Sequence, residues 1–203
     1  MNPAKHRGSH VNRWTATILA LSGAATAAAA SYAGLVTGAV PIDLGIGRRT
    51  RALGPRTVDI DAPRETVFAV LSEPYLDRQT RAMAEKIAIL DRGADMVLAE
   101  HRTPLPGGLV ARTTETVRFT APERIDFRLV RGPVPYVVEQ FLLAETGSGT
   151  RVEYHGEMGT DLGPVGQRWA RIVVGPWENA VAATFAGVKS EAERRARTQP
   201  RAH

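Results

Sequence analysis

The sequence contains no cysteine, which excludes disulfide bonds, thiol nucleophiles and thiolate metal sites. Lysine is scarce as well: only Lys5, Lys86 and Lys189 occur, so arginine supplies most of the positive charge of a chain whose net charge is +5. The arginines are spread among 21 acidic residues, and the local surpluses lie at the two ends instead of on one stripe. This distribution predicts a protein that does not bind nucleic acid.

Motifs for metal binding, hydrolysis and phosphate binding are also missing. The histidines are His6, His10, His101, His155 and His203. Their spacing fits no metal site, and we expect most of them on the solvated surface. No serine lies in a Gly-x-Ser-x-Gly setting, and no glycine-rich turn carries a P-loop lysine. The sequence therefore predicts no metal and no cofactor.

Charge is absent from one long segment near the N-terminus. No charged residue lies between Arg13 and Asp43, and a membrane-spanning helix needs about 20 residues. Trp14 lies where an interfacial anchor would be expected. The pattern predicts a basic segment over residues 1–13, a transmembrane helix over 14–42 and a basic linker over 43–54. The protein would then be a single-pass membrane protein.

Two other interpretations of this segment remain open. It could be a cleaved secretory signal with an A-x-A site at residues 28–30, so that the mature protein is secreted, or a soluble alanine-rich arm. The apolar run continues past Ala30, which favours the anchor. The positive charges on its two sides nearly balance, so they leave the side of the membrane open with a slight preference for the cytoplasm.

The folded part begins with a strand that passes directly into a helix. Residues 57–61 alternate between apolar and polar, and Asp61 is a suitable helix cap before Pro63 and Glu65. Pro74 ends this helix, and a second short helix is predicted after it. Six turn-bounded strand patterns follow with short connections, as in an antiparallel meander. After Gly163 the apolar period becomes helical, with a kink expected at residues 175–176.

This order predicts an α+β domain over residues 55–196, followed by a disordered tail over 197–203. Three segments carry a resemblance to a known superfamily: VDIDAPRETVFAVLSEP, GTRVEY and FAGVKSEAERRA. In these segments and their order, the chain resembles the SRPBCC or START-like helix-grip superfamily, which includes polyketide cyclase/dehydrase and lipid-transport proteins. The N-terminal run is similar to the anchor of some actinobacterial members. The resemblance implies a curved, antiparallel, seven-stranded sheet wrapped around a long C-terminal helix, with an apolar cavity between them.

Strand and helix periodicity predicts which side chains face this cavity. The strand positions are Thr113, Glu115, Val117, Phe127, Leu129, Glu139, Phe141 and Tyr154. The helix positions are Trp169, Val173, Trp177 and Val181. Pairing through the turn at residues 146–149 also sets Phe141 near Tyr154.

The two carboxylates on the inner face have two possible roles. Buried acids have raised pKa values, so Glu115 and Glu139 are candidates for ligand anchoring or acid–base chemistry. The alternative, which we favour from the sequence, places them at the rim in ion pairs with arginines. The arginines considered are Arg102, Arg168 and Arg171.

We therefore expect a membrane-tethered domain that binds a hydrophobic small molecule or lipid and is more a binding protein than an enzyme. One alternative is a cyclase or dehydratase that uses Glu115, Glu139 or Tyr154, which requires one of them deep in the cavity without an arginine partner. Another is a scaffold without a ligand, whose own side chains would fill the cavity.

Overall fold

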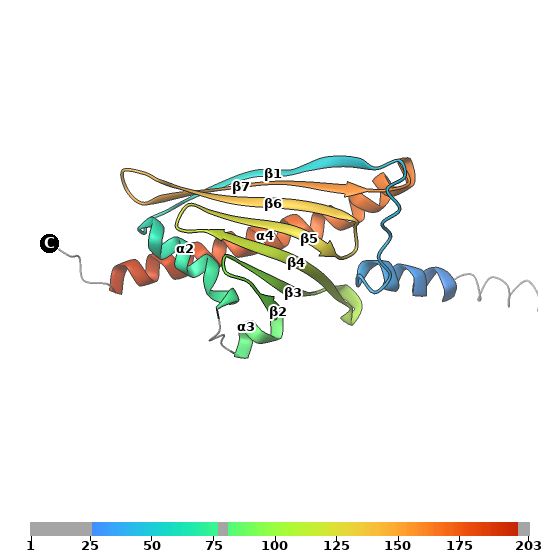
Figure 1. The fold of residues 1–203 in the computed structure, drawn as a ribbon, viewed down its shortest axis with the longest axis horizontal. Coiled ribbons are helices and arrows are strands. Elements are labelled where there is room, and N and C mark those ends of the chain that lie inside the picture. The colour runs from blue at the N-terminus through green and yellow to red at the C-terminus, as the bar shows by residue number, and fades with distance from the viewer. Residues whose placement is uncertain (1–25, 77–80, 199–203) are drawn as a thin grey trace, which may run out of the picture.

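One antiparallel sheet forms the framework of the computed structural model, which describes residues 26–76 and 81–198. Within these residues the sheet has seven strands in the order β1-β7-β6-β5-β4-β3-β2 (Figure 1). The strands are β1 (Arg49–Ile60), β2 (Ile87–Arg92), β3 (Met96–Pro104), β4 (Val110–Thr120), β5 (Arg124–Arg131), β6 (Tyr136–Glu145) and β7 (Thr150–Thr160). Strands β2 to β7 form the predicted meander, and β1 closes the sheet beside β7.

The helices lie on one side of this sheet. Helix α2 (Arg64–Ser72) follows β1, the 3-10 turn η1 (Glu73–Tyr75) follows α2, and α3 (Arg81–Lys86) precedes β2. The long helix α4 (Pro164–Thr198) runs along the sheet (Figure 1). The predicted fold, a curved sheet with two short helices after its first strand and a long C-terminal helix, is confirmed.

Two local predictions about the helices were wrong, and a third is not tested. The residue that caps α2 is Pro63, with no side-chain hydrogen bond, so Asp61 is not the cap. Helix α4 continues through Pro176, because contacts along its length hold it against the sheet and offset one missing N–H donor; the kink expected there stays a prediction. The same helix continues to Thr198, so residues 197–198 are helical and not part of a tail.

The N-terminal segment also differs from its prediction. Residues 26–36 are helical, and the helix ends there because Gly38 has φ +71° and the chain turns. Residues 37–42 are therefore not helical, and residues 49–54, predicted to be linker, form the first half of β1. Residues 14–25 of the predicted transmembrane helix lie outside the described residues. In the part of the chain that the structure describes, no helix has the length and apolar character needed to cross a bilayer.

The core lies between the concave face of the sheet, α2 and α4. Strand parity places Val117 inward and Phe141 beside Tyr154 across β6 and β7, as predicted, and Ile125 is also buried there. The start of α4 packs tightly on the end of β7. A Cβ atom on Gly166 would lie 1.8 Å from the carbonyl oxygen of Asp161, so the approach of these two backbones requires glycine.

This contact predicts opposite effects for two substitutions in the same helix. Gly166→Ala should lower the free energy of unfolding by roughly 1–3 kcal/mol through overpacking. Gly187→Ala is the matched control, because open space surrounds Gly187, and it should raise stability by about 0.5–1 kcal/mol. Urea unfolding followed by circular dichroism measures both. A Gly166→Ala protein as stable as wild type would show that the helix is not held this closely.

Candidate functional site

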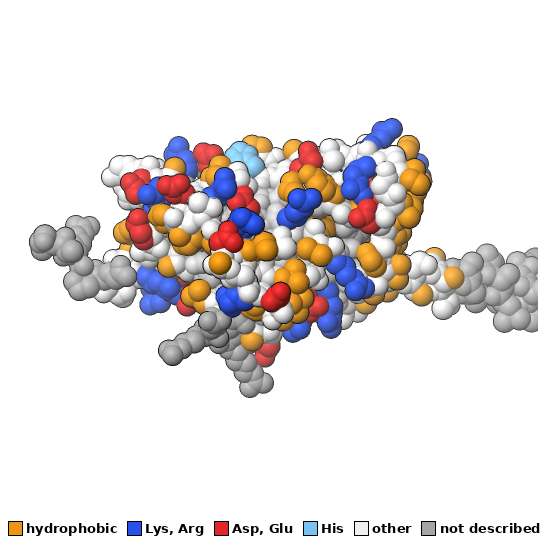
Figure 2. All heavy atoms as spheres, viewed as in Figure 1, with side chains coloured by type: hydrophobic (Ala, Val, Ile, Leu, Met, Phe, Trp, Pro, Cys, Tyr) orange, Lys and Arg blue, Asp and Glu red, His pale blue; other side chains and the backbone are white. Residues whose placement is uncertain are grey.

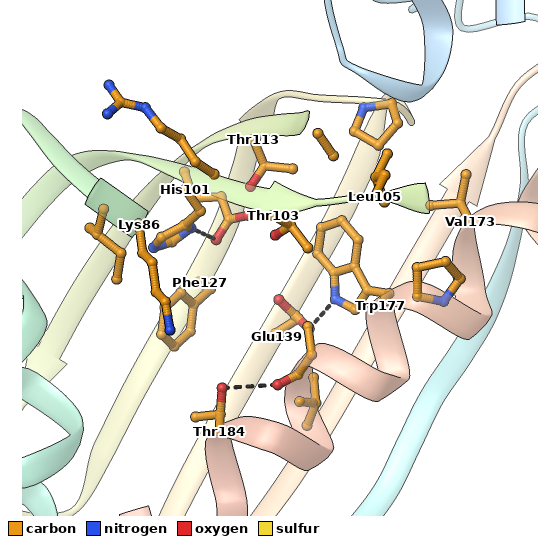
Figure 3. A pocket seen from close by; sticks show the side chains of 18 of the residues that line it. Lys86, His101, Thr103, Leu105, Thr113, Phe127, Glu139, Val173, Trp177 and Thr184 are labelled. Atoms are coloured by element: carbon orange, nitrogen blue, oxygen red, sulfur yellow. Dashed lines mark hydrogen bonds and ion pairs between the residues drawn. The ribbon is translucent and has the colours of Figure 1, made fainter. Parts of the chain in front are cut away.

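A cavity of about 510 Å³ lies between the sheet and α4 (Figure 3). Strands β3 to β6, helix α2, η1 and α4 contribute its walls, and Tyr32 and Val36 of the N-terminal helix lie at one side. The lining is mainly apolar, with Tyr75, Phe127 and Phe141 as its aromatic surfaces. Polar and charged side chains also reach it, among them Lys86, His101 and Arg102 and the two buried carboxylates Glu115 and Glu139.

The residues predicted to face the cavity divide into two groups. Those that line it are Thr113, Glu115, Phe127, Glu139, Phe141, Val173, Trp177 and Val181. The remaining four are not part of its wall: Val117, Leu129, Tyr154 and Trp169. Val117, Leu129 and Tyr154 are buried in the core instead. Trp169 donates its indole N–H to the carbonyl oxygen of Pro133 at 2.7 Å.

Glu139 joins the sheet to the long helix. Its Oε1 atom accepts a hydrogen bond from the hydroxyl of Tyr154 on β7. The same atom accepts one from the indole N–H of Trp177 on α4 at 2.6 Å (Figure 3). Only 9% of Glu139 is exposed. Burial, followed by the negative charge of Glu115, raises the pKa of Glu139 to about 7, although the two hydrogen bonds oppose the rise.

Glu115 belongs to a second polar group, which also contains His101 and Tyr75. The His101 Nδ1 atom lies 3.0 Å from Glu115 Oε2, and its Nε2 atom lies 3.0 Å from the Tyr75 hydroxyl. Burial lowers the pKa of His101, but the charge of Glu115 and their hydrogen bond outweigh it and raise the pKa overall. Burial acts to raise the pKa of Glu115, and the charge of His101 with its hydrogen bond lowers it overall. The pairing therefore favours the charged forms of both side chains.

Two features of this site differ from what the sequence indicated. The carboxylates have no arginine partner among residues 26–76 and 81–198, because Glu115 pairs with His101 and Glu139 with Tyr154 and Trp177. The prediction that these carboxylates lie at the rim in ion pairs with arginines was therefore wrong. His101, expected on the surface, is mostly buried, with 18% of its side chain exposed.

One signal in the sequence could have located His101. It alternates with the buried Val97 and Ala99 along β3, and it pairs with Thr113 on β4. Strand parity therefore places it on the inner face beside Glu115. Tyr75 has no comparable signal, because η1 is a three-residue turn without periodicity.

The arrangement combines two different acid–base groups at one apolar surface. The pKa of Glu139 lies near 7, whereas the contact between His101 and Glu115 raises the pKa of the imidazole and lowers that of the carboxyl. A bound molecule could therefore meet a neutral or ionised carboxyl at Glu139 and the paired His101 and Glu115 side chains at another point. No group of three metal-ligating side chains occurs in the described part of the chain.

The pKa of Glu139 predicts how stability depends on pH. A folded-state pKa above the ordinary value of 4.5 means that the folded protein holds more protons than the unfolded chain up to about pH 7, so stability falls as pH rises through this range. The loss should reach roughly 3 kcal/mol. Glu139→Gln should remove this component, while Glu65→Gln, at an exposed position, should keep it. Denaturant unfolding between pH 4.5 and 8 measures the difference, and equal slopes for wild type and Glu139→Gln would contradict the assignment.

Similar solved structures share this fold at low sequence identity. The Zhui aromatase/cyclase from Streptomyces sp. R1128 superposes with a TM-score of 0.57 at 19% identity, over 74% of this chain and 97% of that chain. Norcoclaurine synthase from Thalictrum flavum, in complex with dopamine and hydroxybenzaldehyde, has a TM-score of 0.53 at 15% identity, over 71% and 87%. The di-domain aromatase/cyclase BexL has a TM-score of 0.53 at 18% identity over 76% of this chain, and the chain spans 52% of its length.

The sequence comparison gives the family directly. No curated protein sequence matches the chain significantly. A family model described as polyketide cyclase / dehydrase and lipid transport matches residues 55–193, which include all seven strands of the sheet except the start of β1, and most of α4. The chain therefore belongs to the polyketide cyclase / dehydrase and lipid transport family.

Proposed function

We propose that this protein binds a hydrophobic small molecule or lipid in the cavity between the sheet and α4. The supporting observation is an apolar cavity of about 510 Å³ that the protein's own side chains leave open. Protein interiors tolerate few voids, and ligand sites commonly enclose about 300–1,000 Å³ with a few placed polar groups. A scaffold domain that acts only through its surface would have no need of such a space.

The lining suggests what kind of molecule fits. Tyr75, Phe127 and Phe141 form adjacent ring contacts, with centroid separations of 6.1 Å and 5.6 Å along the series. Such a surface packs well against flat rings or a folded acyl chain. Glu139 provides a polar contact, since its carboxyl donates to a carbonyl or accepts from a hydroxyl according to its protonation state. The ligand we propose is therefore mainly apolar and carries at least one carbonyl or hydroxyl group.

A pair of substitutions on α4 tests the binding proposal. Ala180 lines the cavity, whereas Ala183, one turn further on, is exposed outside it. Ala180→Phe should fill part of the cavity and weaken binding of 1-anilinonaphthalene by about tenfold, equivalent to about 1.4 kcal/mol. Ala183→Phe should leave the affinity unchanged. Dye fluorescence measures both, and equal affinity in the two variants, or no saturable binding to wild type, would contradict the proposal.

Acid–base catalysis is the second candidate function. It is favoured by one observation: both carboxylates are buried at the cavity without an arginine partner within the described residues, and burial raises the pKa of Glu139 to about 7. A carboxylate with such a pKa is a suitable general base near neutral pH. The corresponding reaction would remove a proton beside a carbonyl group, as in a cyclisation or dehydration.

A generic proton-transfer probe tests this capacity without knowledge of the substrate. In 5-nitrobenzisoxazole, removal of the ring C–H proton by Glu139 would break the N–O bond and give a nitrile and a coloured phenolate. We expect a rate that rises with pH with a midpoint near 7 and that is lost in Glu139→Gln. Glu65→Gln is the control for substitution of an exposed glutamate. An unchanged rate in Glu139→Gln would exclude Glu139 as the base.

Membrane attachment through residues 14–36 is a further part of the proposed function. It is supported by the uncharged run and by the path of the described helix, because Tyr32 and Val36 lie at the cavity and the Tyr32 ring packs on Trp169 at 6.1 Å. The side of the membrane on which the domain lies stays a prediction.

A further inference from the structure

Exposed apolar side chains gather where the N-terminal segment meets the sheet and α4. We call the set Leu44, Ile46, Leu162 and Val165 the apolar edge. These residues are exposed by 55%, 66%, 44% and 64%. They lie together because the N–H of Leu162 donates to the carbonyl of Ile46 and the N–H of Val165 to that of Leu162. Figure 2 shows hydrophobic side chains at the end of the molecule where β1 begins.

A buried aspartate holds the loop of this edge in place. Asp161 is 4% exposed and accepts the N–H groups of Leu44 at 2.6 Å and Gly45 at 2.8 Å. Arg48 donates to it at 2.7 Å. The hydrogen bond from Arg48 is the main cause that lowers the pKa of Asp161 to about 2. Burial acts in the opposite direction, and the two backbone hydrogen bonds lower the pKa further. The loop is thus fixed by charged groups inside while its apolar side chains point outward.

The backbone at Leu162, which belongs to the apolar edge, has a strained conformation. Its φ is 65°, in the left-handed region that residues other than glycine, asparagine and aspartate rarely adopt. Strain of this kind persists where the surroundings impose it and is concentrated at functional sites. A glycine or asparagine here would relieve the strain and would leave a less apolar surface.

We propose that the apolar edge docks on the surface of an anionic lipid bilayer. Apolar side chains held outward beside basic residues fit the boundary between acyl chains and headgroups. Arg168 and Arg171 are exposed on the first turns of α4, near Val165 in the sequence. Arg49 lies on the same side, since it donates to Gln167 at 3.3 Å.

The chain connection favours a bilayer over another protein or a second copy. The uncharged run that begins at Trp14 leads through the helix over residues 26–36 directly into this loop. Any membrane attachment of that run would hold the apolar edge within a few residues of the lipid. The inference deepens the proposed membrane attachment and is independent of what the cavity binds.

Single-cysteine labelling tests the docking in the full chain, because the protein has no cysteine of its own. Ile46→Cys and Val130→Cys are each labelled with an environment-sensitive dye. Val130 is the matched control, since it is 61% exposed on β5 and is not part of the apolar edge. With vesicles of phosphatidylcholine and phosphatidylglycerol, the dye at position 46 should shift to the blue and lose most of its quenching by iodide. The dye at position 130 should not change.

Three outcomes would overturn the proposal. One is a dye at position 46 that stays fully quenched by iodide while the protein is bound to the vesicles. The second is no binding of the full chain to the vesicles at all. The third is a blue shift that grows with protein concentration without lipid, which would identify a second copy as the occupant. Binding of 1-anilinonaphthalene to an unlabelled sample reports on the cavity separately, so failure of docking and failure of ligand binding are distinguishable.

Discussion

The hydrogen bonds on Glu139 are the interaction on which the rest of the site depends. One carboxyl oxygen accepts from Tyr154 on β7 and from Trp177 on α4, and so ties the sheet to the helix at the centre of the cavity. A buried carboxyl that is left without partners is costly, so the sheet and the helix must keep these donors in position. The hydrogen bonds of Glu139 therefore fix the point at which α4 contacts the sheet, and the cavity lies next to this point.

The same constraint separates the two carboxyl groups chemically. Glu115 receives a compensating positive charge from His101, whereas Glu139 receives only neutral donors. The ionised Glu115 then disfavours a second negative charge nearby, which adds to the effect of burial on Glu139. The pKa of Glu115 is therefore lowered, whereas that of Glu139 lies near 7. An apolar cavity with this pair is suited to bind a molecule with a carbonyl or hydroxyl group, and its acid–base properties also allow proton transfer.

Local periodicity predicted the order of strands and helices and part of the site, and the family resemblance supplied the curved sheet around the long helix. Alternation along β4, β5 and β6 placed Glu115, Phe127 and Glu139 on the inner face, and turn pairing placed Phe141 beside Tyr154. Tyr75 could not be predicted in this way, because it lies in a three-residue turn without periodicity, and the parity signal for His101 became clear only with the strand pairing. His101 reaches Glu115 across a strand pair, and Tyr75 reaches His101 from a turn.

The N-terminal segment shows a different limit of sequence patterns. Its apolar composition suggested one helix to residue 42, but composition does not encode the end of a helix, which depends on the turn at Gly38. The same pattern did not reveal that the following loop wraps onto Asp161 at the end of β7. That contact joins residues more than a hundred positions apart, and it fixes the conformation of a loop that the sequence predicted to be linker.

The central claim is that Glu139 is a buried, partly protonated acid facing an open apolar cavity. A ¹³C NMR titration of glutamate-labelled protein tests it most directly, with the Glu139 carboxyl signal assigned by its loss in Glu139→Gln. The account predicts a midpoint near 7, which rises further when 1-anilinonaphthalene displaces water from the cavity. A midpoint near 4.5 that does not respond to the dye would contradict it.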